Sequence, residues 1–242
     1  MMNERLRALV GALIGGLAAL PLPAADNAAQ PAATETPDTE TFSEAESRLW
    51  MTDQLSTIDK AMRLTYRFEK SGSLEKGFTD TVKFVVSRIN ADGSKAAAIE
   101  FFSGERNFPV PPVDSTTVNP VLMVYFQGDV YEMNRLTDES ASSRERWRYF
   151  QRRIKLALAE TATVKPVEFA YQGRQWKGHE ISFDPFVNDP HKDALKQFSA
   201  KHYSVIVSEE LPGYIYRIET HVPGAAPGEY LVREVLELAQ IE

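Results

Sequence analysis

The chain has 242 residues, a formal net charge of −7 at pH 7 and no cysteine. The acidic balance excludes a general nucleic-acid binder, whose binding surface is basic. The lack of cysteine excludes a disulfide framework and an acylated-cysteine lipoprotein anchor, so that the stability of a domain of this length must come from a hydrophobic core.

Residues 1–25 predict a cleaved export signal. A short charged start is followed by an apolar run over residues 8–20 and then by small residues that a signal peptidase accepts. The run is short for a transmembrane helix, although an uncleaved anchor is the alternative. Residues 26–41 are rich in Ala, Pro, Thr and Asp without periodicity, which predicts a flexible linker. We therefore expect a periplasmic protein with a single domain over residues 42–242.

A helix is expected at the start of this domain. Ser43 and Glu46 have the spacing of a capping box, in which each side chain satisfies a backbone N–H at the helix start. Apolar residues then recur at helical spacing, namely Met51, Leu55, Ile58 and Met62. The pattern predicts a helix over residues 45–60.

After the helix the apolar period changes to two, which is typical of strands with one wet face. This alternation predicts strands over 63–69, 78–89 and 95–102, with a turn at 90–93. Their spacing favours an antiparallel meander. The proline-rich segment 107–120 breaks the rhythm and predicts a long loop, because proline lacks the N–H that a paired strand donates.

Two segments in the middle of the chain are strongly apolar or amphipathic. Residues 121–126 are all apolar, which fits either a buried strand or a short core helix. Residues 142–160 predict a helix with an apolar stripe. The stripe consists of Trp147, Phe150, Ile154, Ala157 and Leu158.

The last third of the chain again alternates like strands. Five strands are predicted, over 167–171, 176–183, 202–208, 214–221 and 230–239. Asp189 as N-cap and Pro190 at the first helical position predict a short helix to Ala200. Together the elements predict an α+β fold in which a strongly curved antiparallel sheet of about seven to nine strands, an incomplete β-barrel, packs against about two or three helices.

Basic residues are concentrated in the helix predicted over 142–160. Between Arg144 and Lys155 there are six basic residues and one acid. Such a helix can lie against anionic lipid headgroups or dock a partner with an acidic face. The alternative is a helix whose arginines are solvated or paired with acids of the sheet. The candidate contact residues are Arg144, Arg148, Arg152, Arg153 and Lys155.

Aromatic residues are frequent on the predicted strands and could line the concave side of a curved sheet. An apolar pocket with few polar groups suits lipids or acyl chains. The alternative is a filled core, because aromatic side chains dominate core burial in many β-sheet proteins. The candidate cavity residues are Tyr66, Phe68, Phe84, Trp147 and Trp176.

The sequence indicates no catalytic chemistry of a recognisable kind. It has no nucleophile elbow, nucleotide-binding glycine loop or zinc-protease motif. Its four histidines match no compact metal-ligand spacing, so neither a metal nor a cofactor is expected. Glu69, Asp80 and Glu100 lie on adjacent predicted strands and could form an acid–base pair, although cross-strand pairing with basic neighbours is favoured. No catalytic residue is assigned, and a hydrolase remains the least favoured function.

The order of these elements is similar to that of periplasmic lipoprotein carriers of the LolA/LolB type. An export signal, a helix at 45–60, a meander over 63–102, an interposed helix at 142–160 and strands returning to Ile241 carry the resemblance. In that superfamily an incomplete β-barrel is covered by helices and holds acyl chains in an apolar cavity. The Arg-rich helix and the proline-rich loop have no counterpart in this pattern.

The resemblance rests on element order, so it transfers no functional residue. It implies an exported, non-enzymatic protein that binds a lipid or a lipidated partner in its cavity. The charge of the basic helix, which this resemblance does not cover, adds the expectation of a peripheral membrane contact. The alternative is an envelope scaffold with a filled core, which would bind another protein through a free strand edge and the basic helix.

Overall fold

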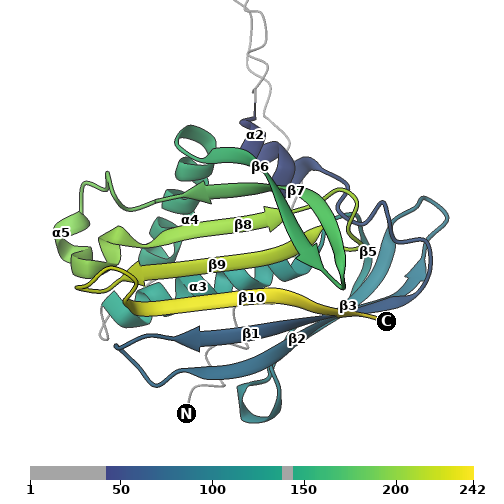
Figure 1. The fold of residues 1–242 in the computed structure, drawn as a ribbon, viewed down its shortest axis with the longest axis horizontal. Coiled ribbons are helices and arrows are strands. Elements are labelled where there is room, and N and C mark those ends of the chain that lie inside the picture. The colour runs from purple at the N-terminus through teal and green to yellow at the C-terminus, as the bar shows by residue number, and fades with distance from the viewer. Residues whose placement is uncertain (1–41, 138–143) are drawn as a thin grey trace, which may run out of the picture. The chain divides into compact units, whose positions relative to one another are not determined.

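The computed structural model describes residues 42–137 and 144–242, of which Ser43–Glu242 form one compact unit. Its ten antiparallel strands make one sheet in the order β4-β3-β2-β1-β10-β9-β8-β7-β6, with β5 paired to β3. The helices α3 and α4 cover one face (Figure 1). The α+β fold with a curved, unclosed sheet is confirmed, with ten strands where fewer were predicted. The predicted export signal and linker lie outside the described residues.

The unit begins with a short helical segment made of α2 (Glu44–Glu46) and the π-helix η1 (Ser47–Met51). The capping box is present: Ser43 Oγ accepts the Glu46 N–H at 3.1 Å, and the Glu46 carboxylate accepts the Ser43 N–H at 3.1 Å. Because these two bonds satisfy backbone donors that a helix start leaves free, they fix where the segment begins.

The prediction that this helix continues to residue 60 is wrong, because it ends at Met51. Thr52 has an extended backbone, and Gln54 Nε2 donates to the Leu49 carbonyl oxygen at 2.8 Å. The Gln54 amide thereby satisfies a carbonyl that a continued helix would have bonded. The apolar residues beyond the helix end still belong to the core, since Leu55 is buried.

The first half of the sheet is the predicted meander with an additional edge. Its strands are β1 (Met62–Ser71), β2 (Phe78–Ile89), β3 (Lys95–Phe101), β4 (Phe108–Pro109) and β5 (Val113–Thr116). The β2–β3 turn is confirmed, with Gly93 at φ 86°. The proline-rich segment is not simply a loop, because it supplies β4 and β5, which pair with β3. Proline is tolerated there, since an edge strand leaves one row of backbone donors without a ladder partner.

A short 3₁₀ turn, η2 (Gly104–Arg106), lies between β3 and β4. The apolar run 121–126 is the first part of a helix, α3 (Pro120–Thr137). Asn119 Oδ1 accepts the Val121 N–H at 3.1 Å at the helix start. The core-helix alternative is therefore the correct one, although the sequence did not predict its length. The next helix, α4 (Arg144–Glu160), confirms the predicted Arg-rich helix over the described residues.

All five strands predicted in the last third are present. They are β6 (Thr163–Tyr171), β7 (Arg174–Phe183), β8 (His202–Val207), β9 (Ile215–Pro223) and β10 (Tyr230–Ile241). The short helix between them is α5 (Lys192–Leu195), continued by the 3₁₀ turn η3 (Lys196–Ala200).

The predicted Asp189–Pro190 helix start is wrong, because the N-cap of α5 is His191. The carboxylate of Asp189 instead faces α4. It contacts Arg153 at 2.9 Å and accepts a hydrogen bond from Tyr149, and its Oδ1 also accepts the His191 N–H at 2.7 Å. Tertiary contacts therefore outweigh the local capping preference.

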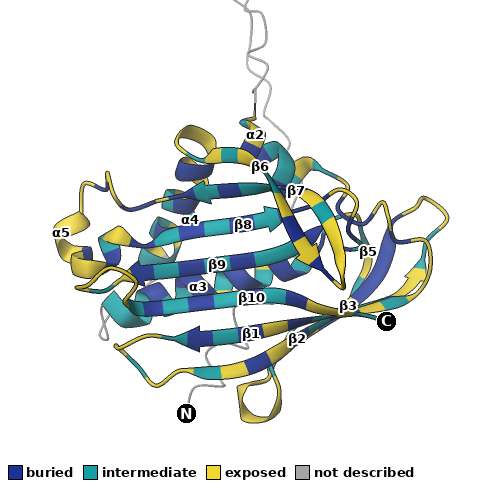
Figure 2. Ribbon diagram, in the orientation of Figure 1, coloured by how far each residue is buried: buried dark blue, intermediate teal, exposed yellow. Residues whose placement is uncertain are grey.

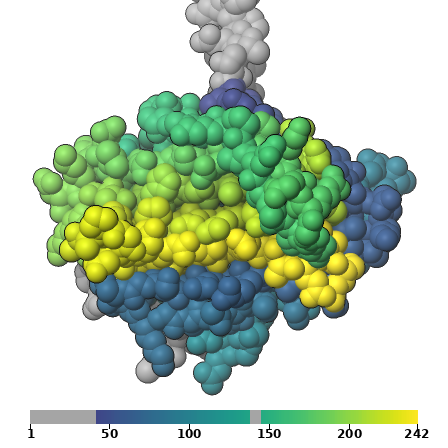
Figure 3. All heavy atoms as spheres, in the orientation of Figure 1, coloured from purple at the N-terminus to yellow at the C-terminus, as the bar shows by residue number. Residues whose placement is uncertain are grey.

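Burial alternates along the strands (Figure 2), and the buried strand residues share one apolar core with the buried residues of α3 and α4. We call the helix-covered side of the sheet the inner face. In the space-filling view of the opposite, outer face, the atoms of neighbouring strands are in direct contact with one another (Figure 3). The largest fully buried side chains include Tyr66, Tyr203, Phe84, Phe150, Phe183 and Phe186.

Candidate functional site

Five apolar side chains cross the inner face in a row, one on each of five neighbouring strands. Each lies directly opposite the next in the register, and all are buried. From β1 to β7 they are Phe68, Leu236, Ile218, Val205 and Ile181. This apolar row is the floor against which a helix can bury its own apolar stripe.

The next row on the same face, two residues along each strand, is polar. Lys70 of β1 lies opposite Glu234 of β10, which lies opposite Thr220 of β9, which in turn lies opposite Tyr203 of β8. All four side chains are buried. Beyond it, Val232 of β10 lies opposite Val222 of β9, and both are buried. One polar row therefore lies between apolar ones.

Helix α3 covers this polar row and supplies its partners. Tyr203 Oη donates to Asp129 Oδ2 at 2.6 Å, and Lys201 Nζ donates to the other oxygen of Asp129. Tyr125 Oη and Thr220 Oγ1 are hydrogen-bonded at 3.2 Å. The polar face of α3 thus lies directly on the polar row.

A second set of ion pairs lies at the β1 end of the row. Lys70 Nζ is 3.2 Å from Glu234 Oε1, and it also donates to Glu132 of α3. Arg135 binds Glu132 at 2.8 Å and Glu75 at 2.7 Å. Arg135 and Glu75 lie at the rim of the cluster, where water reaches their side chains. We call the whole set the α3 ion cluster; it comprises Lys70, Glu75, Asp129, Glu132, Arg135, Lys201 and Glu234.

Burial and pairing shift the two carboxyl groups beside Lys70 in opposite directions. Burial alone would raise the pKa of Glu132, but hydrogen bonds from Arg135 and Lys70 outweigh it and lower that pKa from 4.5 to about 2. Burial raises the pKa of Glu234 above 4.5, because the charges of Lys201 and Lys70 offset only part of the desolvation. Glu234 therefore takes up a proton more readily than an exposed glutamate.

The structure places three of the candidate cavity residues together. Tyr66 and Phe68 of β1 and Phe84 of β2 all lie on the inner face within the apolar core. The side chains of Tyr66 and Phe84 have 0 % exposure, so no water-sized space adjoins either ring. Tyr66 Oη also accepts a hydrogen bond from Asn119 Nδ2 at 3.1 Å. In this structure these positions are filled.

The two candidate tryptophans lie elsewhere on the periphery of the core. Trp147 of α4 is half-buried against the core. Trp176 lies on the β6–β7 hairpin, where its Nε1 donates to the Tyr171 carbonyl oxygen at 3.1 Å and the Arg174 guanidinium lies 4.2 Å from its ring centroid. Trp176 therefore packs on the hairpin end of the same core, with its ring 6.4 Å from that of Tyr171.

The basic residues of α4 divide into two groups. Arg148, Arg152 and Lys155 are exposed. Arg153 points inward, where it contacts Asp189 at 2.9 Å and donates to the Pro185 carbonyl oxygen at 3.0 Å. The side chain of Arg144 lies outside the described part of the structure. The predicted basic face is thus present, but Arg153 does not belong to it.

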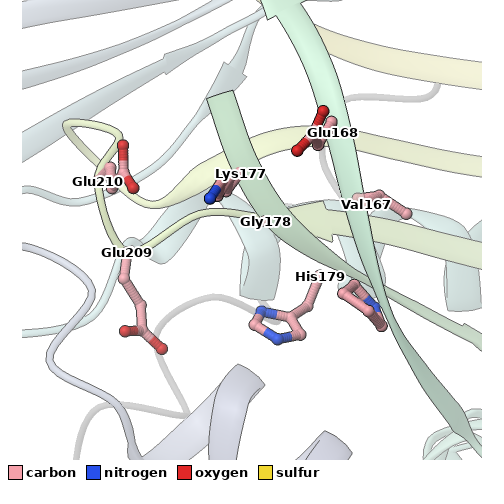
Figure 4. Close-up of a pocket in the computed structure, with 8 residues that line it drawn as sticks. Val167, Glu168, Lys177, Gly178, His179, Glu209 and Glu210 are labelled. Atoms are coloured by element: carbon pink, nitrogen blue, oxygen red, sulfur yellow. The ribbon is translucent and has the colours of Figure 1, made fainter. Parts of the chain in front are cut away.

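A cavity of about 550 Å³ opens beside the β6–β7 hairpin (Figure 4). Lys177, Gly178 and His179 of β7 form one wall, and Glu209 with Glu210 of the turn after β8 forms another. Glu209 and Glu210 already pair with arginines at 3.2 Å. None of the candidate cavity residues contributes to it.

The three carboxylates considered for catalysis do not converge. Glu69 and Glu100 are on the outer face, paired with Arg67 at 2.8 Å and with Lys83 at 2.7 Å. Asp80 lies opposite Phe68 on the inner face and accepts two hydrogen bonds from Ser103. Cross-strand pairing on a wet face, the favoured interpretation, is confirmed for Lys83 and Glu100.

Two kinds of feature are absent from the residues that the structure describes. These residues contain no group of three histidine, cysteine, aspartate or glutamate side chains arranged to hold a metal ion. Within the same residues, no helix combines the length and apolar character that crossing a bilayer requires.

Sequence reasoning missed the α3 ion cluster, although a signal for it exists. Tyr66, Phe68 and Lys70 alternate in one phase of β1, and Glu234, Leu236 and Leu238 do so in β10. A charged residue in the phase that otherwise holds apolar residues marks a buried charge, which must be paired. The partners on α3 could not be found this way, because the helix itself was not predicted beyond residue 126.

No protein-family model matches the chain, and no curated protein matches it. Solved structures similar to it include the following three. The lipoprotein LppX of Mycobacterium tuberculosis shares 9% identity over 81% of this chain and 95% of that one, with a TM-score of 0.32. A LolA superfamily protein of Nitrosomonas europaea shares 9% identity over 82% and 92%, with a TM-score of 0.22. A DUF1329 family protein of Desulfovibrio piger shares 10% identity over 82% and 91%, with a TM-score of 0.27.

The LolA superfamily, to which the order of elements is similar, is thus also represented among these structures.

Proposed function

We propose that this protein binds an amphipathic ligand, a lipid or the lipid moiety of a partner, on the inner face of its sheet beneath α3, and that it catalyses no reaction. One observation carries the proposal, namely the single polar row from Lys70 to Tyr203 between apolar rows. If α3 moved away, this face would offer an apolar floor with one line of hydrogen-bonding groups. An amphipathic molecule presents the same combination.

The chemistry of the α3 ion cluster supports α3 as the element that moves. Apolar side chains of similar volume would hold the helix at least as strongly as buried ion pairs do, because each buried ion has lost its hydration. When α3 leaves the sheet, Lys70, Lys201, Asp129 and Glu234 regain water, which offsets part of the cost of exposing the apolar floor. A bound acyl chain would cover that floor again.

The ligand itself can be tested directly. The protein is purified from the periplasm and analysed by native mass spectrometry followed by organic extraction. A co-purifying lipid at a fixed stoichiometry supports the proposal. If the purified protein is empty and takes up neither palmitic acid nor phosphatidylglycerol, the proposal fails.

The movement of α3 has its own test, because the chain contains no native cysteine. Gly128 is exposed on α3, and a Cβ there meets no atom within 4 Å, so Gly128→Cys can carry an environment-sensitive dye. Lys165→Cys on the exposed edge of β6 is the matched control. We expect palmitic acid or phosphatidylglycerol to change the emission at position 128 and not at position 165. Binding with no change at position 128 would place the ligand elsewhere.

A second candidate function is favoured by the packed state of the core. Because Tyr66 and Phe84 have no accessible surface, the protein could act as an envelope scaffold that binds other proteins and holds no ligand. An edge strand such as β6 is where such a partner would pair. An empty protein whose α3 dye is insensitive to lipid would favour this function.

The export of the protein to the periplasm belongs to the same proposal. Cleavage after Ala25 would leave residues 26–41 as a linker ahead of the single domain over residues 42–242. The intact mass of the periplasmic protein tests this, with the mature chain expected to begin at Asp26. A protein that retains residues 1–25 would favour the uncleaved anchor.

A further inference from the structure

We propose that the exposed face of α4 docks the protein on a membrane surface of anionic phospholipids. The contact is made by Arg148, Arg152 and Lys155, which we call the α4 basic strip. All three side chains are exposed, and their spacing of four and then three residues puts them on one side of the helix. They span about 10 Å along the helix axis.

The α4 basic strip is unpaired within the described residues. No carboxylate there lies within ion-pair distance of any of its three side chains, whereas Arg153 on the same helix is bound to Asp189. Glu145 and Glu160 lie at the two ends of the helix, outside the strip. Since the chain as a whole carries −7, the strip is a local reversal of charge that an anionic surface would attract.

An exposed leucine distinguishes a lipid surface from an acidic protein as the partner. Leu156 follows Lys155, lies one helical turn after Arg152, and is 38% exposed on the same helix. Phosphate groups would bind the basic side chains while the leucine enters the apolar boundary below the headgroups, the arrangement of a helix lying in a membrane interface. The face of an acidic protein would offer no apolar phase to this side chain.

The position of α4 leaves this face accessible. The helix lies on the inner side of the sheet together with α3 (Figure 1), and it packs through its buried residues Phe150, Ile154, Ala157 and Leu158. The basic strip occupies the opposite side of the helix. Docking therefore disturbs no core contact and does not require a ligand beneath α3.

Vesicle co-sedimentation tests the proposal, using phosphatidylcholine vesicles with and without phosphatidylglycerol. The variant is Arg148→Gln/Arg152→Gln/Lys155→Gln. The matched control, Lys76→Gln/Arg88→Gln/Lys165→Gln, removes the same number of charges from exposed positions elsewhere. We expect the wild type to bind only the anionic vesicles, the strip variant to lose on the order of 100-fold in partitioning, and the control to keep its binding.

Three outcomes would overturn the proposal: no binding of the wild type to anionic vesicles, equal losses in both variants, or no loss in the strip variant. The first would leave an acidic protein as the partner to be sought. High salt should weaken docking, because screening shortens the reach of the charges. Leu156→Ala should weaken it further at any salt concentration. Ligand binding beneath α3, measured separately by the dye at position 128, is expected to persist in the strip variant, so that the two proposals fail independently.

Discussion

Lys70 of β1 and Glu234 of β10 are direct cross-strand neighbours whose Nζ and Oε1 atoms lie 3.2 Å apart in the interior. Lys70 also donates to Glu132 of α3, so one ammonium group is paired with carboxylates of both the sheet and the helix that covers it. The arrangement links the attachment of α3 to the protonation state of a few buried groups.

Replacing this lysine should be strongly destabilising. Lys70→Met leaves Glu234 and Glu132 buried without their shared partner, and removal of one partner from a buried ion pair costs about 3–5 kcal/mol. Lys83→Met is the matched control, because Lys83 pairs with Glu100 on the wet face of the sheet. Loss of such a surface ion pair costs about 0–1 kcal/mol of folding stability. Urea unfolding measures both. Similar losses in the two variants would show that the α3 ion cluster is as weakly coupled as a surface pair.

The depressed pKa of Glu132 should make its contribution dependent on pH. A carboxyl whose folded-state pKa lies below its unfolded value stabilises the fold above the unfolded value, here 4.5, and loses that stabilisation as the pH falls toward about 2. Glu132→Gln should therefore cost on the order of 3 kcal/mol at neutral pH. The difference from wild type should shrink in the acid range. If the unfolding free energies of wild type and Glu132→Gln differ by the same amount at every pH across this range, the prediction is wrong.

Glu234 should behave in the opposite way. Its folded-state pKa is raised, so the stability it contributes is fully present below the unfolded value of 4.5 and is lost as the pH rises through the folded value. Glu234→Gln abolishes this loss. As the pH is raised, the variant should gain stability relative to wild type in the same unfolding measurement. A relative loss over that interval would mean that Lys70 and Lys201 outweigh the burial of Glu234.

The strands were predictable because their evidence is local. The period of two in β1, β2, β8, β9 and β10 follows from alternating burial, which each strand shows by itself. The helix-to-turn change after Met51 was not predictable, because Gln54 ends the helix through an amide that also binds the distant Asn119 backbone at 2.8 Å. A contact across that sequence separation leaves no periodic trace.

The candidate site was only partly predictable, for a related reason. The exposed basic residues of α4 could be found because charge density is visible in sequence. The α3 ion cluster joins residues of β1, the loop after β1, β10, α3 and the segment before β8, and only the strand register and the packing of α3 on the sheet bring them together. The exact contacts of Trp176 were not predictable, since aromatic character does not reveal that its ring packs on Tyr171 and that its Nε1 donates to the Tyr171 carbonyl oxygen.

The α3 N-terminus should depend on one buried amide. Asn119 Nδ2 donates to the Gly213 carbonyl oxygen at 2.8 Å and to Tyr66 Oη at 3.1 Å, and Asn119 Oδ1 accepts the Val121 N–H. Asn119→Ala leaves buried groups without partners, which costs about 1–3 kcal/mol for each unsatisfied group.

Asn107→Ala is the matched control, because the Asn107 amide donates to the Phe102 carbonyl oxygen at an exposed position and should be worth only a few tenths of a kcal/mol. Urea unfolding would compare the two variants, and hydrogen exchange would locate the effect. In Asn119→Ala the first turns of α3 should exchange faster while the amides of β9 and β10 keep their protection. Uniform acceleration across the sheet would show instead that α3 and the sheet open as one cooperative unit, in which case α3 could not move alone to admit a ligand.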